Sequence, residues 1–422
     1  MILAAIPPVA RMRGTVRVPG SKSHTNRALM LASMGRGRVR VRGVLDCGDS
    51  DSLVACLRAS GATIEKGAGD LLVIPPSGAP REAVLDARDS GTACRFLAAR
   101  AAATAGFTAS LTGSARLRER PIGPLVEALR GLGGDVAYLG REGFPPLEIR
   151  GRRLEGGDAA VDASMSSQFA SALLLAAPLM RNGIRLRLEG REVSRDYITT
   201  TLEMLTAAGI RWRAAGSAIE VEPGPVSAEE LPIPGDFSSA VPLAGAVAVR
   251  GGEVRLENLE WPSRQADASA FRVLEAMGLA LEASAGGLDV SGRARSPAIA
   301  DASGFPDAVP VLCAIASRAP GESVFSGVEH LRLKESDRIE AIEEMLAAGG
   351  ASSTTHGGEI RVLGTTGPFS LAPPVFPTRA DHRLVMASTL LCLDRGGFVE
   401  EPRSVDKSYP GFFRDLFRGI LA

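Results

Sequence analysis

The chain alternates short polar clusters with apolar runs, and the same order of segments recurs along its length. Each unit opens with a cluster of residues such as Ser, Asp, Lys or Arg, followed by a run rich in Ala and Leu that predicts a helix. A β-like run, a second polar cluster, a second helix ending near Gly and a closing strand complete the unit. Six units are expected, spaced by about 70 residues, which is longer than usual solenoid repeats. They open at residues 21–27, 89–92, 166–168, 236–239, 305–307 and 381–383.

The helix that follows each opening is apolar nearly all round, which predicts that it is buried. Ser, Asp and Thr at the openings are good N-caps, because their oxygens accept hydrogen bonds from the first-turn N–H groups. The start of a buried helix also carries a partial positive charge and is a ready anion site. Capping alone explains any single opening. Six openings, several of which also carry Lys, Arg or Gln, favour a shared anion cleft.

Composition narrows the class of protein. With 422 residues, of which 45% are hydrophobic and 23% charged, the chain is expected to be globular, with two or three domains. A formal net charge of zero gives no sign of a nucleic-acid or membrane partner. The N-terminus lacks the pattern of a signal peptide, and no apolar run is long enough to span a membrane. The five cysteines are scattered, which argues against disulfides or a zinc site and favours the cytoplasm.

The Pro- and Gly-rich stretch 223–236 predicts a linker between two groups of three units. The segment 7–20 precedes the first unit and could supply the strand that the shortened sixth unit lacks.

Basic residues gather at the predicted helix starts of both halves of the chain. Arg120 directly precedes a helix, and Arg383 enters an apolar helix at once, where a buried cation needs an anion or a carboxylate partner. Lys334 and Arg338 are expected to share one helical face, with the acid Glu335 beside them. A solvated charged face is the alternative interpretation of this run. We expect a substrate with several negative charges, bound between two domains, and no metal or cofactor, since no metal or Walker motif is present.

Six motifs, in order along the chain, together resemble the enolpyruvylshikimate-phosphate synthase family. They are PGSKSHTNR at 19–27, DSGTACR at 89–95, RERP at 118–121, SSQ at 166–168, LKESDR at 333–338 and DHR at 381–383. The resemblance implies a two-domain, inside-out α/β barrel built from six βαβαββ repeats, three per domain. It implies one domain of residues 1–16 plus 234–422, which the N-terminal strand joins, and a second domain of residues 17–233. A monomer is expected.

The resemblance implies transfer of the enolpyruvyl group of phosphoenolpyruvate to the 5-hydroxyl of shikimate 3-phosphate, with release of phosphate. The residues that it implies for shikimate 3-phosphate are Lys22, Ser23, Arg27, Ser166, Ser167, Ser194, Tyr197, Asp307 and Lys334, and those for phosphoenolpyruvate are Gly91, Arg120, Arg338, Arg383 and Lys407. Gln168 would lie near both substrates. Asp307 is expected to act as the general base, and Glu335 and Lys22 are candidates for the proton donor.

Two positions depart from the family pattern, since Asp89 and His330 stand where Asn is common. The family resemblance also implies that glyphosate competes with phosphoenolpyruvate.

The nearest rival function is that of the related UDP-N-acetylglucosamine enolpyruvyl transferase. That enzyme typically has a reactive Cys in the loop at residues 113–120, and this chain has no Cys there. The other rival is a non-catalytic anion-binding protein on the same scaffold. It is disfavoured because both Asp307 and Glu335 are present.

Overall fold

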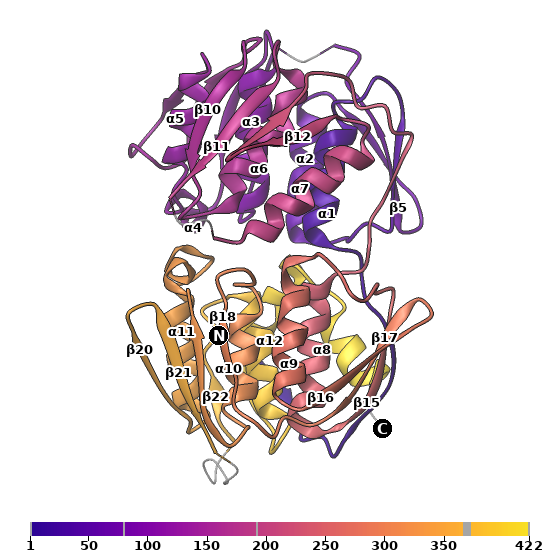
Figure 1. The fold of residues 1–422 in the computed structure, drawn as a ribbon, viewed down its shortest axis with the longest axis vertical. Helices are drawn as coiled ribbons and strands as arrows, with labels where there is room; N and C mark the ends of the chain where they lie inside the picture. Colours follow the sequence, from indigo (N-terminus) through magenta and orange to yellow (C-terminus); the bar gives the residue numbers. More distant parts are fainter. Residues whose placement is uncertain (1, 79–80, 191–192, 366–372, 421–422) are drawn as a thin grey trace. The chain divides into compact units, whose positions relative to one another are not determined.

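The computed structural model describes residues 2–78, 81–190, 193–365 and 373–420, so the last two residues of the sixth repeat lie outside it. The chain divides into two compact units (Figure 1). Unit 1 is Met1–Pro19 together with Pro234–Ala422, and unit 2 is Gly20–Ile233. Each unit holds three sheets, and the mixed α/β architecture with three repeats per unit confirms the predicted fold class.

In unit 2 the sheets have the strand orders β14-β3-β5-β4, β6-β7-β9-β8 and β10-β11-β13-β12. The strands are β3 (Val39–Arg42), β4 (Thr63–Lys66), β5 (Asp70–Ile74), β6 (Glu82–Asp86), β7 (Thr108–Thr112), β8 (Asp135–Tyr138), β9 (Leu147–Arg150), β10 (Gly157–Asp162), β11 (Ile184–Glu189), β12 (Trp212–Ala215), β13 (Ala218–Val221) and β14 (Glu230–Pro232). The helices are α1 (Lys22–Ala32), α2 (Gly48–Ala59), α3 (Gly91–Ala103), α4 (Ala115–Arg118), α5 (Gly123–Gly131), α6 (Ser167–Ala176), η1 (Ala177–Leu179) and α7 (Arg195–Ala207).

In unit 1 the sheets have the orders β16-β17-β15-β2, β18-β19-β21-β20 and β1-β23-β22. The strands are β1 (Leu3–Ile6), β2 (Met12–Arg17), β15 (Gly252–Glu257), β16 (Leu279–Ser284), β17 (Gly287–Gly292), β18 (Ile299–Asp301), β19 (Gly321–Ser326), β20 (Ser352–His356), β21 (Glu359–Gly364), β22 (Val375–Phe376) and β23 (Gly397–Glu400). The helical segments are α8 (Phe237–Arg250), η2 (Ala266–Ala268), α9 (Ser269–Ala276), α10 (Val309–Ala316), η3 (Glu329–Leu333), α11 (Arg338–Ala348), α12 (His382–Cys392), η4 (Pro402–Lys407), α13 (Phe412–Arg414) and η5 (Asp415–Gly419).

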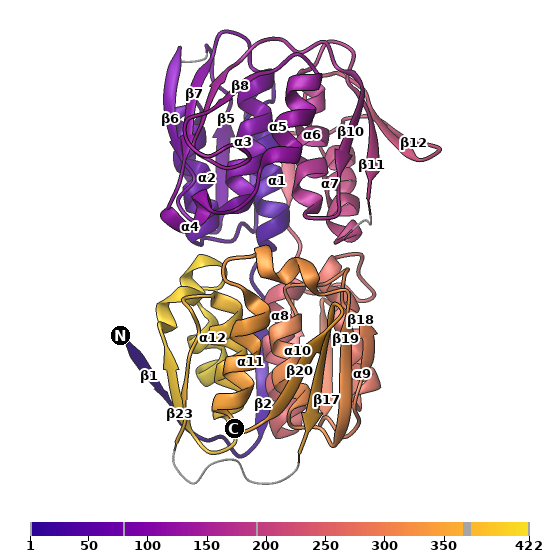
Figure 2. The ribbon, with the colours of Figure 1, turned by 90° about the vertical axis from the view of Figure 1, so that its left-hand side faces the viewer.

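The repeats exchange strands along the chain. β1 pairs antiparallel with β23 and completes the sixth repeat (Figure 2), but it precedes the segment 7–20 that was expected to supply this strand, so that prediction is wrong in its residues. β2, which directly precedes α1, pairs instead with β15 of the fourth repeat. In return, β14 lies inside the predicted linker and pairs with β3 of the first repeat. The segment 223–236 is therefore a linker that also contributes one short strand.

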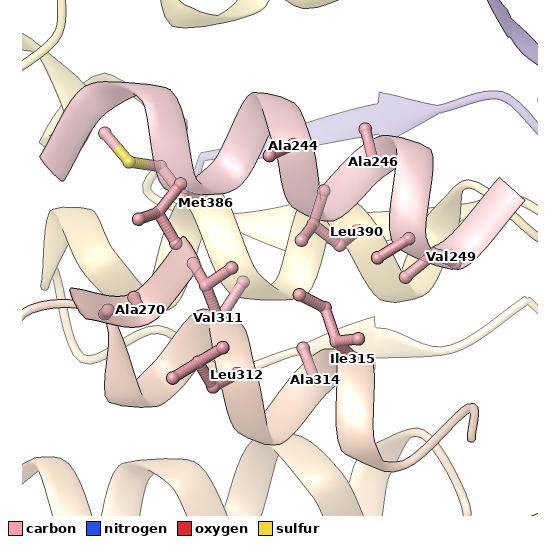
Figure 3. Close-up of a cluster of buried hydrophobic side chains, with 14 of the residues drawn as sticks. Ala244, Ala246, Val249, Ala270, Val311, Leu312, Ala314, Ile315, Met386 and Leu390 are labelled. Carbon is pink, nitrogen blue, oxygen red and sulfur yellow. The ribbon is translucent and has the colours of Figure 1, made fainter. Parts of the chain in front are cut away.

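The first helix of each repeat is buried, as its uniformly apolar sequence predicts. In unit 1 the helices α8, α10 and α12 pack against one another through buried side chains (Figure 3), and the sheets lie outside them (Figure 1). Their contact needs a small residue, because a Cβ at Gly245 would come within 2.7 Å of Leu390 and 3.1 Å of Val311. Close-packed interiors of this kind hold the helix starts in fixed positions.

Four of the six predicted helix openings are confirmed as side-chain caps. Ser90, Ser166, Asp236 and Asp381 each accept a hydrogen bond from a first-turn backbone N–H. The capping prediction is wrong for α1 and α10, whose N-cap residues make no such bond. In front of α10, the carboxylate of Asp307 is instead engaged by two arginines, as described below.

Candidate active site

In unit 2, Arg27 is a buried cation whose hydrogen bonds to the described residues go to neutral groups. It lies in α1, and its Nε donates to the Thr201 hydroxyl at 2.8 Å. Its Nη2 donates to the carbonyl of Tyr197 at 2.9 Å and to the Ser171 hydroxyl at 3.2 Å, which ties α1 to α6 and α7. Burial lowers the pKa of Arg27 to about 10, so the side chain stays charged at neutral pH. A buried cation solvated by neutral dipoles is suited to a substrate carboxylate.

Other predicted residues of unit 2 gather at the starts of the same helices. Lys22 lies in the first turn of α1, and its ammonium pairs with Asp49 at 3.0 Å. Gln168 in α6 accepts from Arg95 of α3 at 2.5 Å and donates to Thr92 at 3.1 Å. Ser166 caps α6, and Ser167 is its first residue. Ser194, the N-cap residue of α7, has a φ of 57°, in the left-handed region that few side chains adopt.

Arg120 lies directly against the backbone of Gly91. A Cβ added at Gly91 would meet Nη1 of Arg120 at 2.5 Å and its Cζ at 2.7 Å. The absence of a side chain at position 91 therefore sets where this buried guanidinium sits. The neighbouring Asp89 carboxylate accepts a short hydrogen bond from the Ser114 hydroxyl.

Gly91→Ala is expected to displace Arg120, because a flexible side chain yields before backbone does. If Arg120 binds phosphoenolpyruvate, as the family resemblance implies, the KM for this substrate should rise by roughly tenfold or more, as for a lost charged hydrogen bond, and the KM for shikimate 3-phosphate should change little. Steady-state kinetics on both substrates measure this. Gly131→Ala is the matched control, since a Cβ there has no neighbour within 4 Å. Equal effects on both substrates would contradict the placement of Arg120.

In unit 1, Arg338 is the centre of a buried ion cluster. Its side chain is only 1% exposed and pairs with Asp307, Glu335 and Asp381, each at 2.8 Å. Burial alone would lower the pKa of Arg338, but these carboxylates raise it well above the ordinary value. Arg338 is therefore permanently charged, and the three acids are oriented by one guanidinium.

Arg383 shares Asp307 with Arg338. Its Nη2 lies 3.1 Å from Asp307 Oδ2, and its Nη1 donates to the carbonyl of Ser238 at 2.9 Å. The hydroxyl of Ser238 in turn makes a short hydrogen bond to the buried carboxylate of Asp267. This meets the expectation that an arginine entering a buried helix needs a carboxylate partner.

Lys407 and Glu335 complete the cluster, since the ammonium lies 3.1 Å from Glu335 Oε1 while Arg338 holds Oε2. The prediction that Lys334 and Arg338 share a helical face is wrong. The short 3₁₀ segment η3 ends at Leu333, and α11 begins only at Arg338, where Asp337 caps it. The half-buried Lys334 lies in the extended link between them, which lets Glu335 fold back onto Arg338.

Two of the three buried histidines are His24 in α1 and His330 in η3. Burial above all lowers the pKa of each to about 3, helped by Arg27 for His24 and by Lys334 for His330. Both are therefore neutral at pH 7. Neither can be an acid–base group in the neutral range.

Protein stability is expected to fall as the pH drops from 6.5 toward 3. A histidine whose pKa is lowered in the folded state contributes stability above its unfolded pKa and loses it on acidification. Chemical denaturation at several pH values should show His330→Asn to be less acid-sensitive than the parent, by on the order of 1–3 kcal/mol. The exposed His356 provides the control, because His356→Asn should leave the pH dependence unchanged. If the free energy of unfolding fell equally with pH in the parent and in His330→Asn, the lowered pKa of His330 would be refuted.

Some residues at the two clusters escaped the sequence interpretation. Asp381 was visible only as a helix cap and part of a motif, but it also holds Arg338. Thr201 and Ser171 gave no signal, since single hydroxyl residues inside helices are usually structural. Asp267 is likewise isolated in sequence. Within the described ranges, no group of three or more His, Cys, Asp or Glu side chains is arranged to hold a metal ion.

Comparison with known proteins shows which family this arrangement belongs to. The family model described as EPSP synthase (3-phosphoshikimate 1-carboxyvinyltransferase) matches residues 6–416. The chain belongs to the EPSP synthase family. A 3-phosphoshikimate 1-carboxyvinyltransferase from Methanoculleus marisnigri is 36% identical over 411 residues, covering 96% of each chain. One from Thermococcus kodakarensis is 36% identical over 417 residues, covering 98% of this chain and 99% of the relative.

A solved structure of EPSP synthase from Acinetobacter baumannii has the same fold. It superposes with a TM-score of 0.79 at 25% identity, covering 100% of this chain and 98% of that one. Family membership makes the chain an enolpyruvyl transferase that acts on shikimate 3-phosphate and phosphoenolpyruvate. The reaction belongs to the shikimate pathway of aromatic amino-acid biosynthesis.

Proposed function

We propose that the chain transfers the enolpyruvyl group to the 5-hydroxyl of shikimate 3-phosphate by metal-free addition–elimination, with no cofactor. The observation that carries this proposal is the pairing of Asp307 with both Arg338 and Arg383 in one buried cluster. Two arginines beside a carboxylate can bind an anionic substrate and keep the carboxylate ionised as a base.

For shikimate 3-phosphate, we propose that Arg27 binds the carboxylate, with Lys22 and Ser23 nearby. Its phosphate would be held by Ser166, Ser167 and Ser194, with Tyr197 close by. Ser166 at the N-terminus of α6 supports this assignment, because helix starts favour phosphate. Asp307 and Lys334 would hold the ring hydroxyls.

For phosphoenolpyruvate, we propose binding by Gly91, Arg120, Arg338, Arg383 and Lys407, with Gln168 near both substrates. The planar forks of arginines match carboxylate and phosphate oxygens, and the charge that develops during reaction would be stabilised without reorganisation.

The reaction would begin when Asp307 removes the proton of the 5-hydroxyl and the oxygen attacks the enol carbon. The methylene carbon takes up a proton from Lys22 or Glu335. The tetrahedral adduct then loses phosphate, while one proton of the new methyl group returns to the group that donated it, and the carbon–carbon double bond re-forms as the enol ether. Lys22 pairs with Asp49, whereas both oxygens of Glu335 are bound by cations. These contacts support Lys22 as the proton donor over Glu335.

The product tests the proposal directly. Nuclear magnetic resonance of the reaction mixture should show a carboxyvinyl ether at the 5-oxygen and unchanged phosphate at the 3-position. Substitution at another oxygen would contradict the proposed position of Asp307.

We further propose a cytoplasmic monomer without nucleic-acid or membrane partners. In the described part of the chain, no helix has the length and apolar character needed to cross a bilayer.

A further inference from the structure

Asp267 is a buried carboxylate behind Arg383. It lies in the 3₁₀ turn η2 before α9 and is 1% exposed. Its Oδ2 accepts the short hydrogen bond from the Ser238 hydroxyl, and the carbonyl of the same serine accepts from Arg383. One residue of α8 thus links Asp267 to the guanidinium proposed to bind phosphoenolpyruvate.

The turn that carries Asp267 also fixes the start of α8. The side-chain amide of Gln265 donates to the carbonyl of Gly235 at 2.7 Å and accepts from the backbone N–H of Phe237 at 3.2 Å. Gln265 and Asp267 together therefore hold the first turn of α8, including Ser238, in one position. Removing either polar group would loosen the backbone carbonyl on which Arg383 rests.

Charged groups from three further segments face Asp267. They include Arg383 of α12, Asp307 ahead of α10 and Asp236 at the start of α8. Burial, followed by the charge of Asp307, raises the pKa of Asp267 to about 6, against the opposing effects of Arg383 and Ser238.

An anion that binds Arg383 adds negative charge beside two carboxylates. The two oxygens of Asp307 are already bound by Arg338 and Arg383. Asp267 is the more deeply buried of the two carboxylates, which makes its charged form costly, so protonating Asp267 relieves the repulsion. The Ser238 hydroxyl that donates to Asp267 Oδ2 belongs to a half-buried residue, so Asp267 is hydrogen-bonded to a residue that is partly exposed to solvent.

We propose that Asp267 is a positioning residue of the phosphoenolpyruvate site, which holds Ser238 and Arg383 in place and takes up one proton when the anionic substrate binds Arg383. This inference rests on the proposed function, in which Arg383 contacts phosphoenolpyruvate. The proton comes from solvent, and no covalent bond other than the new O–H bond is formed.

The ratio of pH profiles tests this inference. kcat/KM for phosphoenolpyruvate is measured from pH 5.5 to 8.5 at saturating shikimate 3-phosphate, for the parent and for Asp267→Asn. Dividing the two profiles cancels the titration of the substrate itself. Asparagine mimics the protonated acid, so the ratio of variant to parent should rise at least roughly tenfold between pH 6 and pH 8, since one linked proton changes affinity tenfold per pH unit at most.

Ser238→Ala gives a second, independent readout. Loss of the hydroxyl removes a hydrogen bond that favours the ionised carboxylate of Asp267. The pH above which kcat/KM for phosphoenolpyruvate begins to fall, which is the break in the profile, should therefore be higher. Asp394→Asn is the matched control. Asp394 lies at the far ends of α8 and α12, where it pairs with Arg250 and Arg318. It should reproduce the parent profile.

A flat ratio for Asp267→Asn with an unmoved break for Ser238→Ala would overturn the inference. If Asp267→Asn does not fold, an unmoved break in Ser238→Ala alone would overturn it. Arg383→Lys distinguishes a failure of the proposed phosphoenolpyruvate site from a failure of the proposed role of Asp267. If it leaves the KM for phosphoenolpyruvate unchanged, the proposed placement of that substrate fails. If it raises the KM while the ratio stays flat, only the role of Asp267 fails.

Discussion

Asp307→Ala is expected to lower kcat by on the order of 10³-fold, the size of a lost general base. The carboxylate is 22% exposed, and the guanidinium groups of both Arg338 and Arg383 hold it, so the substitution removes an oriented acid. Arg338 keeps Glu335 and Asp381 as partners, which should preserve the fold. Binding of shikimate 3-phosphate, measured by calorimetry, should change by only a modest factor.

Asp394→Asn serves again as a control for Asp307→Ala, since it removes a paired carboxylate elsewhere in unit 1. Near-normal turnover in Asp307→Ala would remove this residue from the role of base. A large loss of shikimate 3-phosphate binding with intact turnover would show that its main function is to bind the sugar hydroxyls.

Arg338→Ala should lower the free energy of unfolding more than any of the other proposed substitutions. It leaves Asp381, which is wholly buried, and two partly buried acids without their shared cation. Breaking a buried ion pair from one side costs about 3–5 kcal/mol in the free energy of unfolding. Chemical denaturation measures the loss, and activity should disappear with it.

Arg379→Ala is the matched control in the same region. Arg379 pairs with Glu340 and Glu344 of α11, but its side chain is 34% exposed and the glutamates more so. Exposed pairs of this kind contribute about 1 kcal/mol or less. If Arg338→Ala were as stable as Arg379→Ala, the buried cluster would not have the energetic weight that its geometry indicates.

The repeat pattern was readable from sequence because it depends on local signals. Apolar runs, caps and glycines recur in the same order, so the six buried helices and their sheets could be predicted. The exchange of β2 and β14 between repeats could not, because both strands precede similar helices and only long-range pairing distinguishes them. The charged residues at 334–337 are compatible with a helix, but α11 begins only at Arg338, because the side chain of Asp337 caps it there.

The candidate site was predictable where charge stands out against an apolar helix, as at Arg27, Arg338 and Arg383. The partners of these cations were less predictable, because they come from distant segments. Asp267 reaches Arg383 through Ser238, although 116 positions separate the acid from the arginine in the sequence. Such a chain of contacts exists only after the helices have packed.

Release of inorganic phosphate from phosphoenolpyruvate tests the central claim most directly. The purified chain is incubated with phosphoenolpyruvate alone, with added shikimate 3-phosphate, or with UDP-N-acetylglucosamine in its place. We expect rapid phosphate release only with shikimate 3-phosphate, and we expect Asp307→Ala to abolish it. Binding of shikimate 3-phosphate without phosphate release would contradict the account and indicate a non-catalytic anion-binding protein, and release with the nucleotide sugar would indicate the related transferase.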